Sequence, residues 1–167
     1  KKIAAIKEEK GVIDRATCYA LQSHEVPCKH LTNEELLLLP VDVLVPAALE
    51  NQITAQNAGN IRANVILELA NGPTTEDADR ILARRGIEVI PDILANAGGV
   101  AGSYFEWIQS KKGEQWDEET VLKKIEQVMV KAFDDVKKTR EEINLPWRKA
   151  AYLRAVSRIA EAMKKAV

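Results

Sequence analysis

Three asparagines follow apolar runs at equivalent positions. Asn51, Asn71 and Asn96 each fall within a few residues of the end of a β-branched segment. Open α/β sheets bind ligands outside the carboxyl ends of their strands, and an Asn side chain offers two donors and an acceptor without charge. Such a set suits a carboxamide or ribose hydroxyls. Each asparagine alone could also cap a helix or form a turn, and Asn51 is interpreted in that way.

A glycine-rich segment at residues 97–102 matches the pattern A-x-G-x-x-G, which is close to a dinucleotide-binding fingerprint. The fingerprint follows the first strand of its domain directly, whereas six residues separate Ile90 from Ala97. We therefore do not interpret it as a fingerprint. The glycines instead predict that a ligand or a neighbouring helix comes close to the backbone.

Other reactive side chains form no convincing site. Cys18, His24, Cys28 and His30 have gaps that fit none of the usual zinc spacings, so a zinc site there is the weakest alternative and we expect no metal. The sequence has no G-x-S-x-G elbow, and Ser103 is interpreted as a hydrogen-bonding residue and not as a nucleophile.

The elements that must position the asparagines can be read from apolar patterning. Near-continuous apolar runs at 41–45, 64–69 and 87–90 predict parallel strands covered on both faces. Between them, Thr54 predicts the start of a helix at 55–62, and Thr74 with Asp77 predicts the cap of a helix at 78–85 that Gly86 ends. Helices are also expected at 1–10, 118–142 and 147–166, with a loop at 12–32 and the aromatic residues at 104, 105 and 107 in the core.

These elements predict an α/β fold. It is a partial doubly wound, Rossmann-like parallel sheet of about three strands, followed by long C-terminal helices. This makeup is half of a doubly wound domain.

Composition limits the classes of function. The chain has 167 residues, 46% hydrophobic and 29% charged, which suits one soluble domain. Its net charge of −1 gives no electrostatic reason to expect nucleic acid or an anionic membrane as a partner. No apolar stretch has the length of a membrane span and no signal peptide is evident, and two cysteines fit a reducing cytoplasm.

Several motifs together resemble the glutamate dehydrogenases, from about Thr32 to the C-terminus and more weakly before it. They are PAALEN at 46–51, ANGPTT at 70–75, IPDILANAGGV at 90–100 and SYFEW at 103–107, with TNEEL at 32–36 and RKAAY at 148–152. Leucine, valine and phenylalanine dehydrogenases share the architecture. The Pro-Thr-Thr and Ser-Tyr-Phe-Glu-Trp runs favour the glutamate enzymes.

The resemblance implies oxidative deamination of L-glutamate to 2-oxoglutarate and ammonia, with NAD or NADP as the cofactor. It also implies a cytoplasmic homo-hexamer. The residues it implies at the cofactor are Asn71 and Asn96, beside the nicotinamide and its ribose, and Pro46 and Ala47, along the cofactor groove. At the substrate it implies Val100 and Ser103, with Ser103 reaching a carboxylate.

Two positions depart from the family pattern, Leu69 in place of Gly and Gly102 in place of a larger apolar residue. The family's substrate domain, with its catalytic lysine and aspartate, and its glycine-rich phosphate turn have no counterpart. The chain is therefore expected to be the C-terminal part of the enzyme, without catalytic residues and inactive alone. Residues 1–110 would form half of the dinucleotide-binding domain, and 111–167 a helical segment packing back toward the substrate domain. The alternative is a non-catalytic α/β module that binds a protein partner through its open sheet edge.

Overall fold

The computed structural model describes residues 31–166, and the chain divides into two units, Lys1–Leu37 and Leu38–Val167. The described part of the first unit is helix α3 (Asn33–Leu37), which begins with a capping box. Thr32 Oγ1 accepts from the Glu35 backbone N–H at 3.1 Å, and Glu35 Oε2 accepts from the Thr32 N–H at 2.8 Å. The helix predicted at 1–10, the Cys18–His30 cluster and nearly all of the loop predicted at 12–32 lie outside the described residues.

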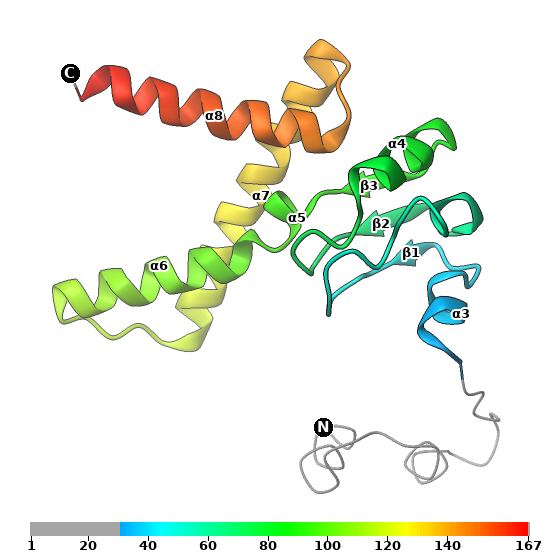
Figure 1. Ribbon diagram of the computed structural model, residues 1–167. Helices are drawn as coiled ribbons and strands as arrows, with labels where there is room; N and C mark the ends of the chain where they lie inside the picture. The colour runs from blue at the N-terminus through cyan, green and yellow to red at the C-terminus, as the bar shows by residue number, and fades with distance from the viewer. Residues whose placement is uncertain (1–30, 167) are drawn as a thin grey trace, which may run out of the picture. The chain divides into compact units, whose positions relative to one another are not determined.

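The second unit contains a parallel sheet of three strands in the order β1-β2-β3 (Figure 1). The strands are β1 (Val43–Leu44), β2 (Val65–Leu67) and β3 (Glu88–Ile90), and β2 pairs in parallel with both neighbours. The predicted α/β class and parallel sheet are confirmed. Each strand lies within the run predicted for it and is shorter than that run.

The segment between β1 and β2 differs from its prediction. Only a single 3-10 turn, η1 (Ala58–Asn60), replaces the helix expected at 55–62. The Asn57 side chain accepts from the Thr54 N–H and donates to the Gln52 carbonyl, both at 2.9 Å, so it stabilises a local loop. Asn and Gly are also poor helix formers, which explains why the prediction was wrong.

Helix α4 (Glu76–Arg84) connects β2 to β3 and packs against η1 and β3. Its N-cap is Thr75, whose hydroxyl accepts from the Ala78 N–H at 3.4 Å, and not Thr74 as predicted. Thr74 instead lies opposite Ile53 in an isolated parallel bridge, in which the Ile53 N–H donates to the Pro73 carbonyl at 2.8 Å and the Ile53 carbonyl accepts from the Thr75 N–H at 2.9 Å. Gly86 ends the helix with φ at 73°, the left-handed conformation predicted for it.

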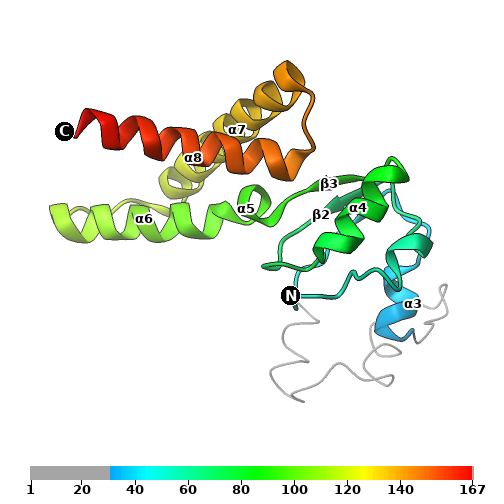
Figure 2. The same ribbon diagram turned by 45° about the horizontal axis from the view of Figure 1, so that its top comes forward.

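Four helices follow β3: α5 (Asp92–Ala95), α6 (Ala97–Lys112), α7 (Glu118–Ile143) and α8 (Trp147–Lys165). The last two confirm the predicted long helices to within one residue at each end. Helix α7 contacts both α6 and α8, and Figure 2 shows α7 crossing α8. Asn144, with φ at 50°, ends α7, and Pro146 immediately precedes α8.

The glycines of α6 serve helix packing. A Cβ built on Gly98 would lie 3.6 Å from Ile125 Cγ2, and one on Gly102 would lie 3.6 Å from Ile125 Cδ1. Both glycines therefore face α7. The glycine-rich segment was expected to meet either a ligand or a neighbouring helix, and at these two glycines it meets the helix α7.

The helices attach to the sheet through β3. Leu94, Val136, Trp147, Ala150 and Ala151 form a buried cluster that joins α5, α7 and α8. Both carboxylate oxygens of Glu88, on β3, accept hydrogen bonds there, one from Arg140 Nη2 at 2.7 Å and one from the Trp147 indole N–H.

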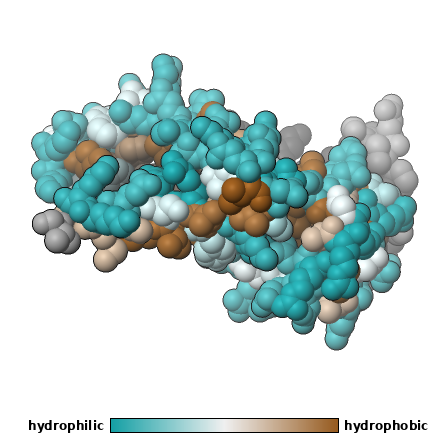
Figure 3. Space-filling view, turned by 90° about the horizontal axis from the view of Figure 1, so that it is seen from above, coloured by the Kyte–Doolittle hydropathy of each residue, from teal (hydrophilic) through white to brown (hydrophobic). Residues whose placement is uncertain are grey.

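Much apolar surface on the helices is exposed. Tyr104 and Trp107 stack on one another and are 54% and 55% exposed, so the prediction that they belong to the core was wrong. Helix α8 exposes Tyr152, Leu153, Val156, Ile159 and Met163. Figure 3 shows apolar surface among the hydrophilic side chains of the face in view. Within residues 31–166, every helix is too short or too polar to cross a membrane.

Candidate functional site

Two of the three strand-end asparagines meet directly. Asn96 Nδ2 donates to Asn71 Oδ1 at 2.7 Å and also lies 3.4 Å from the Leu69 carbonyl oxygen. Asn71 follows β2, and Asn96 lies between α5 and α6, shortly after β3. Two loops that are remote in sequence therefore present one pair of side-chain amides.

Neither amide of this pair caps a helix. Asn96 occupies the N-cap position of α6 but makes no capping hydrogen bond through its side chain. Thr75, not Asn71, caps α4. The interpretation of these two residues as caps is therefore not supported by their contacts.

Asn51 has the conformation of a turn residue. Its φ is 53°, in the left-handed region that Asn tolerates better than other residues with a side chain, and its N–H donates to the Gly72 carbonyl at 2.9 Å. This agrees with its interpretation as a turn residue. It supports the Asn71–Gly72 loop through its backbone.

The Asn71–Asn96 pair leaves two polar groups available. Within residues 31–166, neither Asn96 Oδ1 nor the Asn71 amide nitrogen has a protein partner. The neighbouring Gly72 has φ at 54°, and a Cβ built on it would meet no atom within 4 Å. An acceptor, a donor and open space thus lie together at the carboxyl end of the sheet.

Pro46 and Ala47 follow β1 at the same end of the sheet. Pro46 is buried, and its carbonyl accepts from the Leu69 and Ala70 N–H groups at 3.0 and 2.9 Å. Ala47 is exposed. Pro46 therefore supports the segment that leads into Asn71, and Ala47 contributes accessible surface.

Val100 and Ser103 lie in the first two turns of α6. Val100 is 75% exposed and Ser103 is also exposed. They extend the exposed surface away from Asn96 along the helix.

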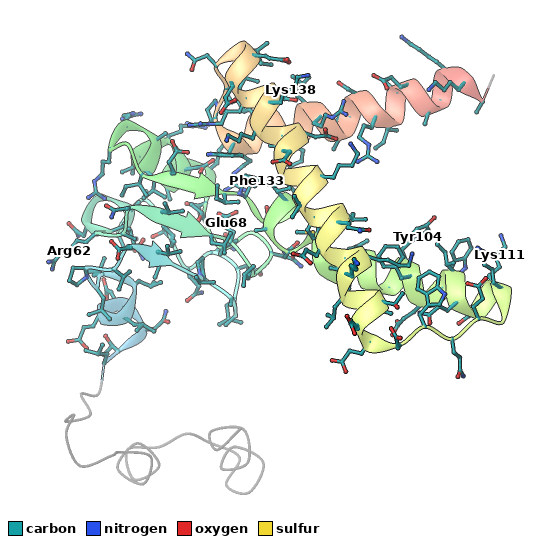
Figure 4. The ribbon with its side chains drawn as sticks, turned by 180° about the vertical axis from the view of Figure 1, so that it is seen from behind. Arg62, Glu68, Tyr104, Lys111, Phe133 and Lys138 are labelled. Carbon is teal, nitrogen blue, oxygen red and sulfur yellow. The ribbon has the colours of Figure 1, made fainter. Side chains whose placement is uncertain are left out.

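A charged cluster near the asparagine loops is centred on Arg148, in the first turn of α8. Its Nη1 and Nη2 donate to the two carboxylate oxygens of Glu68 at 3.0 and 2.8 Å. Its Nε donates to Asp79 Oδ2 at 2.9 Å, and Nη1 lies 3.3 Å from Asp92 Oδ1. The Glu68 side chain is fully buried, and Figure 4 marks its position beside the sheet.

Asp92 connects this cluster to both asparagine loops. Its Oδ2 accepts from the Gly72 N–H at 2.8 Å, its N–H donates to Glu68 Oε2 at 2.9 Å, and its carbonyl accepts from the Asn96 N–H at 3.0 Å. One residue thus contacts the neighbour of Asn71 and the backbone of Asn96.

The charge of Arg148 is strongly favoured in this setting. Burial by itself would lower the pKa of the guanidinium, but its hydrogen bonds and ion pairs with Glu68 and Asp79 raise that pKa above its ordinary value. Arg148 therefore remains a cation around neutral pH.

The predicted site did not include this cluster, although the sequence carries two signals of it. Glu68 is a charged residue within an apolar strand segment, which requires a buried partner. Arg148 is a basic residue in the first turn of a helix, where the helix dipole disfavours it. Asp92 begins α5, where a helix N-terminus by itself favours an acidic residue, so its position gives no separate signal of the cluster.

No group of three potential metal ligands among His, Cys, Asp and Glu occurs within the described residues. The candidate zinc ligands at 18–30 lie outside them.

Comparison with known proteins identifies similar sequences. The family model of Glutamate/Leucine/Phenylalanine/Valine dehydrogenase matches residues 1–166. The glutamate dehydrogenase of Thermotoga maritima is 56% identical over 137 residues, covering 82% of this chain and 33% of the relative. The NAD-specific enzyme of Clostridioides difficile is 46% identical (96% and 39% covered), and the NADP-specific enzyme of a Synechocystis species is 48% identical (90% and 34% covered).

A solved structure also matches. The hetero-hexameric glutamate dehydrogenase of Thermus thermophilus in its leucine-bound form aligns with a TM-score of 0.84 and 28% identity, over 99% of this chain and 37% of that one. The matched part is 33% to 39% of the length of these proteins.

Proposed function

The chain belongs to the Glutamate/Leucine/Phenylalanine/Valine dehydrogenase family, and we propose that it is part of an NAD(P)-dependent glutamate dehydrogenase. In the proposed reaction a hydride leaves the α-carbon of L-glutamate for NAD or NADP, and the amino group loses a proton. Water then replaces the nitrogen, giving 2-oxoglutarate and ammonia. The observation that carries the proposal is the Asn71–Asn96 amide pair at the carboxyl end of the sheet.

The chemistry of the pair fits a nicotinamide carboxamide. The Asn71 amide nitrogen can donate to the carboxamide oxygen, and Asn96 Oδ1 can accept from the carboxamide nitrogen. The open space beside Gly72 allows a planar group to approach the backbone. When bound, the nicotinamide supplies the hydride acceptor, and the two asparagines orient it.

The neighbouring residues complete the proposed site. Ala47 borders the cofactor groove. Pro46 lies along the same groove and supports the segment that leads into Asn71. Val100 and Ser103 face the substrate, where the Ser103 hydroxyl donates to a carboxylate. Residues 1–110 thereby contribute half of a dinucleotide-binding domain, and 111–167 a helical segment whose exposed apolar face packs toward a substrate domain.

The general base and the phosphate-binding turn belong, in this proposal, to another part of the polypeptide. In support, the matched part is 33% to 39% of the length of its relatives. Each of the two groups is worth orders of magnitude in rate. Residues 1–167 alone are therefore inactive, and the complete protein acts as a cytoplasmic hexamer.

Purification of the full-length polypeptide that carries this chain tests the proposal. Reduction of NAD or NADP should require L-glutamate, and leucine, valine and phenylalanine should be poorer substrates. A polypeptide that binds neither cofactor and oxidises none of the four amino acids would refute the assignment.

The position of β1 as the last strand of the described sheet, with Val43 50% exposed, favours the second candidate, a non-catalytic interaction module. Titrations of the full-length polypeptide with NADH and with NADPH separate the two candidates, because a pure interaction module would bind neither cofactor.

A further inference from the structure

We propose that Asp92 is a positioning residue for hydride transfer: held by Glu68 and Arg148, it fixes the two loops that carry Asn71 and Asn96. This inference rests on the proposed function, because it concerns the orientation of the amides that would hold the nicotinamide. Asp92 acts through the loops and does not itself touch the cofactor.

The two carboxylate oxygens of Asp92 have separate tasks. Oδ2 accepts from the Gly72 N–H at 2.8 Å and so restrains the loop after β2. Oδ1 accepts from the Ile93 N–H at 2.8 Å and lies 3.3 Å from Arg148 Nη1. Because both oxygens are occupied, the Asp92 side chain has one orientation that satisfies all its partners.

The cluster behind Asp92 fixes that orientation. Arg148 binds Glu68 in the bidentate geometry that favours guanidinium–carboxylate pairs, and Glu68 Oε2 also accepts from the Asp92 N–H. The Glu68 carboxylate is fully buried and would be costly to leave unpaired. The Asp92 backbone is therefore held by Glu68 and its side chain by Arg148, which lies at the start of α8.

The asparagine pair depends on this arrangement. The Asn71 and Asn96 amides stay 2.7 Å apart only while both loops keep their positions, and Asp92 contacts each loop. Hydride transfer is sensitive to small displacements of the reacting groups, so a shift of either loop lowers the rate even when the cofactor still binds.

Asp79 provides a matched control. It is another Asp bound to Arg148, through Nε at 2.9 Å, and it lies on α4, where its side chain makes no hydrogen bond to the Asn71 or Asn96 loop. An Asn at position 79 can keep that hydrogen bond with its single carbonyl oxygen. An Asn at position 92 must lose an acceptor on one side, since an amide has one acceptor oxygen where the carboxylate has two.

The test uses the full-length polypeptide with Asp92→Asn and Asp79→Asn. We measure kcat per site that binds the reduced cofactor (NADH or NADPH, whichever the wild type uses), the KM values, and hydrogen exchange of peptides covering residues 69–73 and 93–97. Asp92→Asn should lower kcat per site by roughly tenfold to a hundredfold, the loss expected for one hydrogen bond to a charged group, with little change in KM. It should also speed exchange in both peptides, whereas Asp79→Asn should leave both properties at the wild-type level.

The outcomes separate the two proposals. If the wild type oxidises glutamate and both variants lose kcat equally, or neither does, the positioning role is refuted and the proposed function stands. If the wild type lacks activity, the proposed function fails, and hydrogen exchange alone decides whether Asp92 orders the loops. Equal or unchanged exchange in the two variants refutes that ordering as well.

Discussion

Replacing Asn96 with Ala is the most direct perturbation of the proposed cofactor site. The substitution removes the amide that donates to Asn71 Oδ1 at 2.7 Å, together with the acceptor oxygen proposed to hold the nicotinamide carboxamide. The backbone of Asn96 can keep its hydrogen bond to the Asp92 carbonyl, so α5 and α6 should remain intact.

The size of the effect follows from the lost hydrogen bonds. The strong contact to Asn71 and the proposed contact to the cofactor are two neutral bonds, worth roughly 1–3 kcal/mol together. If they act mainly at hydride transfer, kcat should fall by about one to two decades. Because Asn96 is partly exposed, the free energy of unfolding should fall by no more than about 1 kcal/mol.

The assay is steady-state oxidation of L-glutamate by the full-length polypeptide, with thermal unfolding measured on the same samples. Asn51→Gly is the control, because glycine adopts the φ of 53° freely and keeps the backbone N–H that donates to Gly72. It should retain wild-type kcat/KM. Equal losses of kcat/KM in the two variants at equal thermal stability would refute the ranking of these loops.

Three further expectations concern stability and assembly. Arg148→Met should lower the free energy of unfolding by about 3–5 kcal/mol, because it leaves the buried Glu68 carboxylate without its cation. In urea unfolding, Arg148→Lys should lower this free energy by less. Adding Glu68→Gln to Arg148→Met should restore part of it. Asp117→Ala should lower the Tm at neutral pH, since hydrogen bonds from Thr120 lower the pKa of Asp117. The difference in Tm should persist above the ordinary pKa of about 4 and disappear as the pH falls through the lowered value; a constant difference down to acid pH would contradict this cause. Residues 1–167 alone should show no glutamate-dependent NAD(P) reduction. They should also self-associate through their exposed apolar faces. Light scattering that shows a stable monomer at high concentration would contradict this self-association.

The elements that are long or strongly patterned could be predicted from the sequence. Three apolar runs located the strands, and the periodicity after residue 117 located α7 and α8. The local errors have local causes. Asn57 uses its side chain to close a loop where a helix was expected. Thr74 lies in the extended bridge with Ile53, and the next residue, Thr75, caps α4.

The position of the asparagine pair could also be predicted, because parallel strands bring their carboxyl ends to one edge of the sheet. The rule gives the edge but not the contacts. It did not distinguish Asn51, which adopts a turn conformation, from Asn71 and Asn96, which bond to one another. The turn interpretation of Asn51 agrees with its φ of 53°, whereas the bond between Asn71 and Asn96 depends on loop positions that only the folded chain defines.

In the charged cluster, Glu68 and Arg148 are each unfavourable where they stand, and each compensates the charge of the other. Glu68 weakens an apolar strand, and Arg148 opposes the dipole of its own helix, so each position alone is a poor choice. They are 80 residues apart in sequence, and only the fold brings them together at 2.8 Å. Residues that break a local rule mark places where a protein gives up stability for another purpose. Here the paired residues hold Asp92, which in turn holds the loops of the proposed cofactor site, so the search for further positioning residues should begin from such misplaced charges.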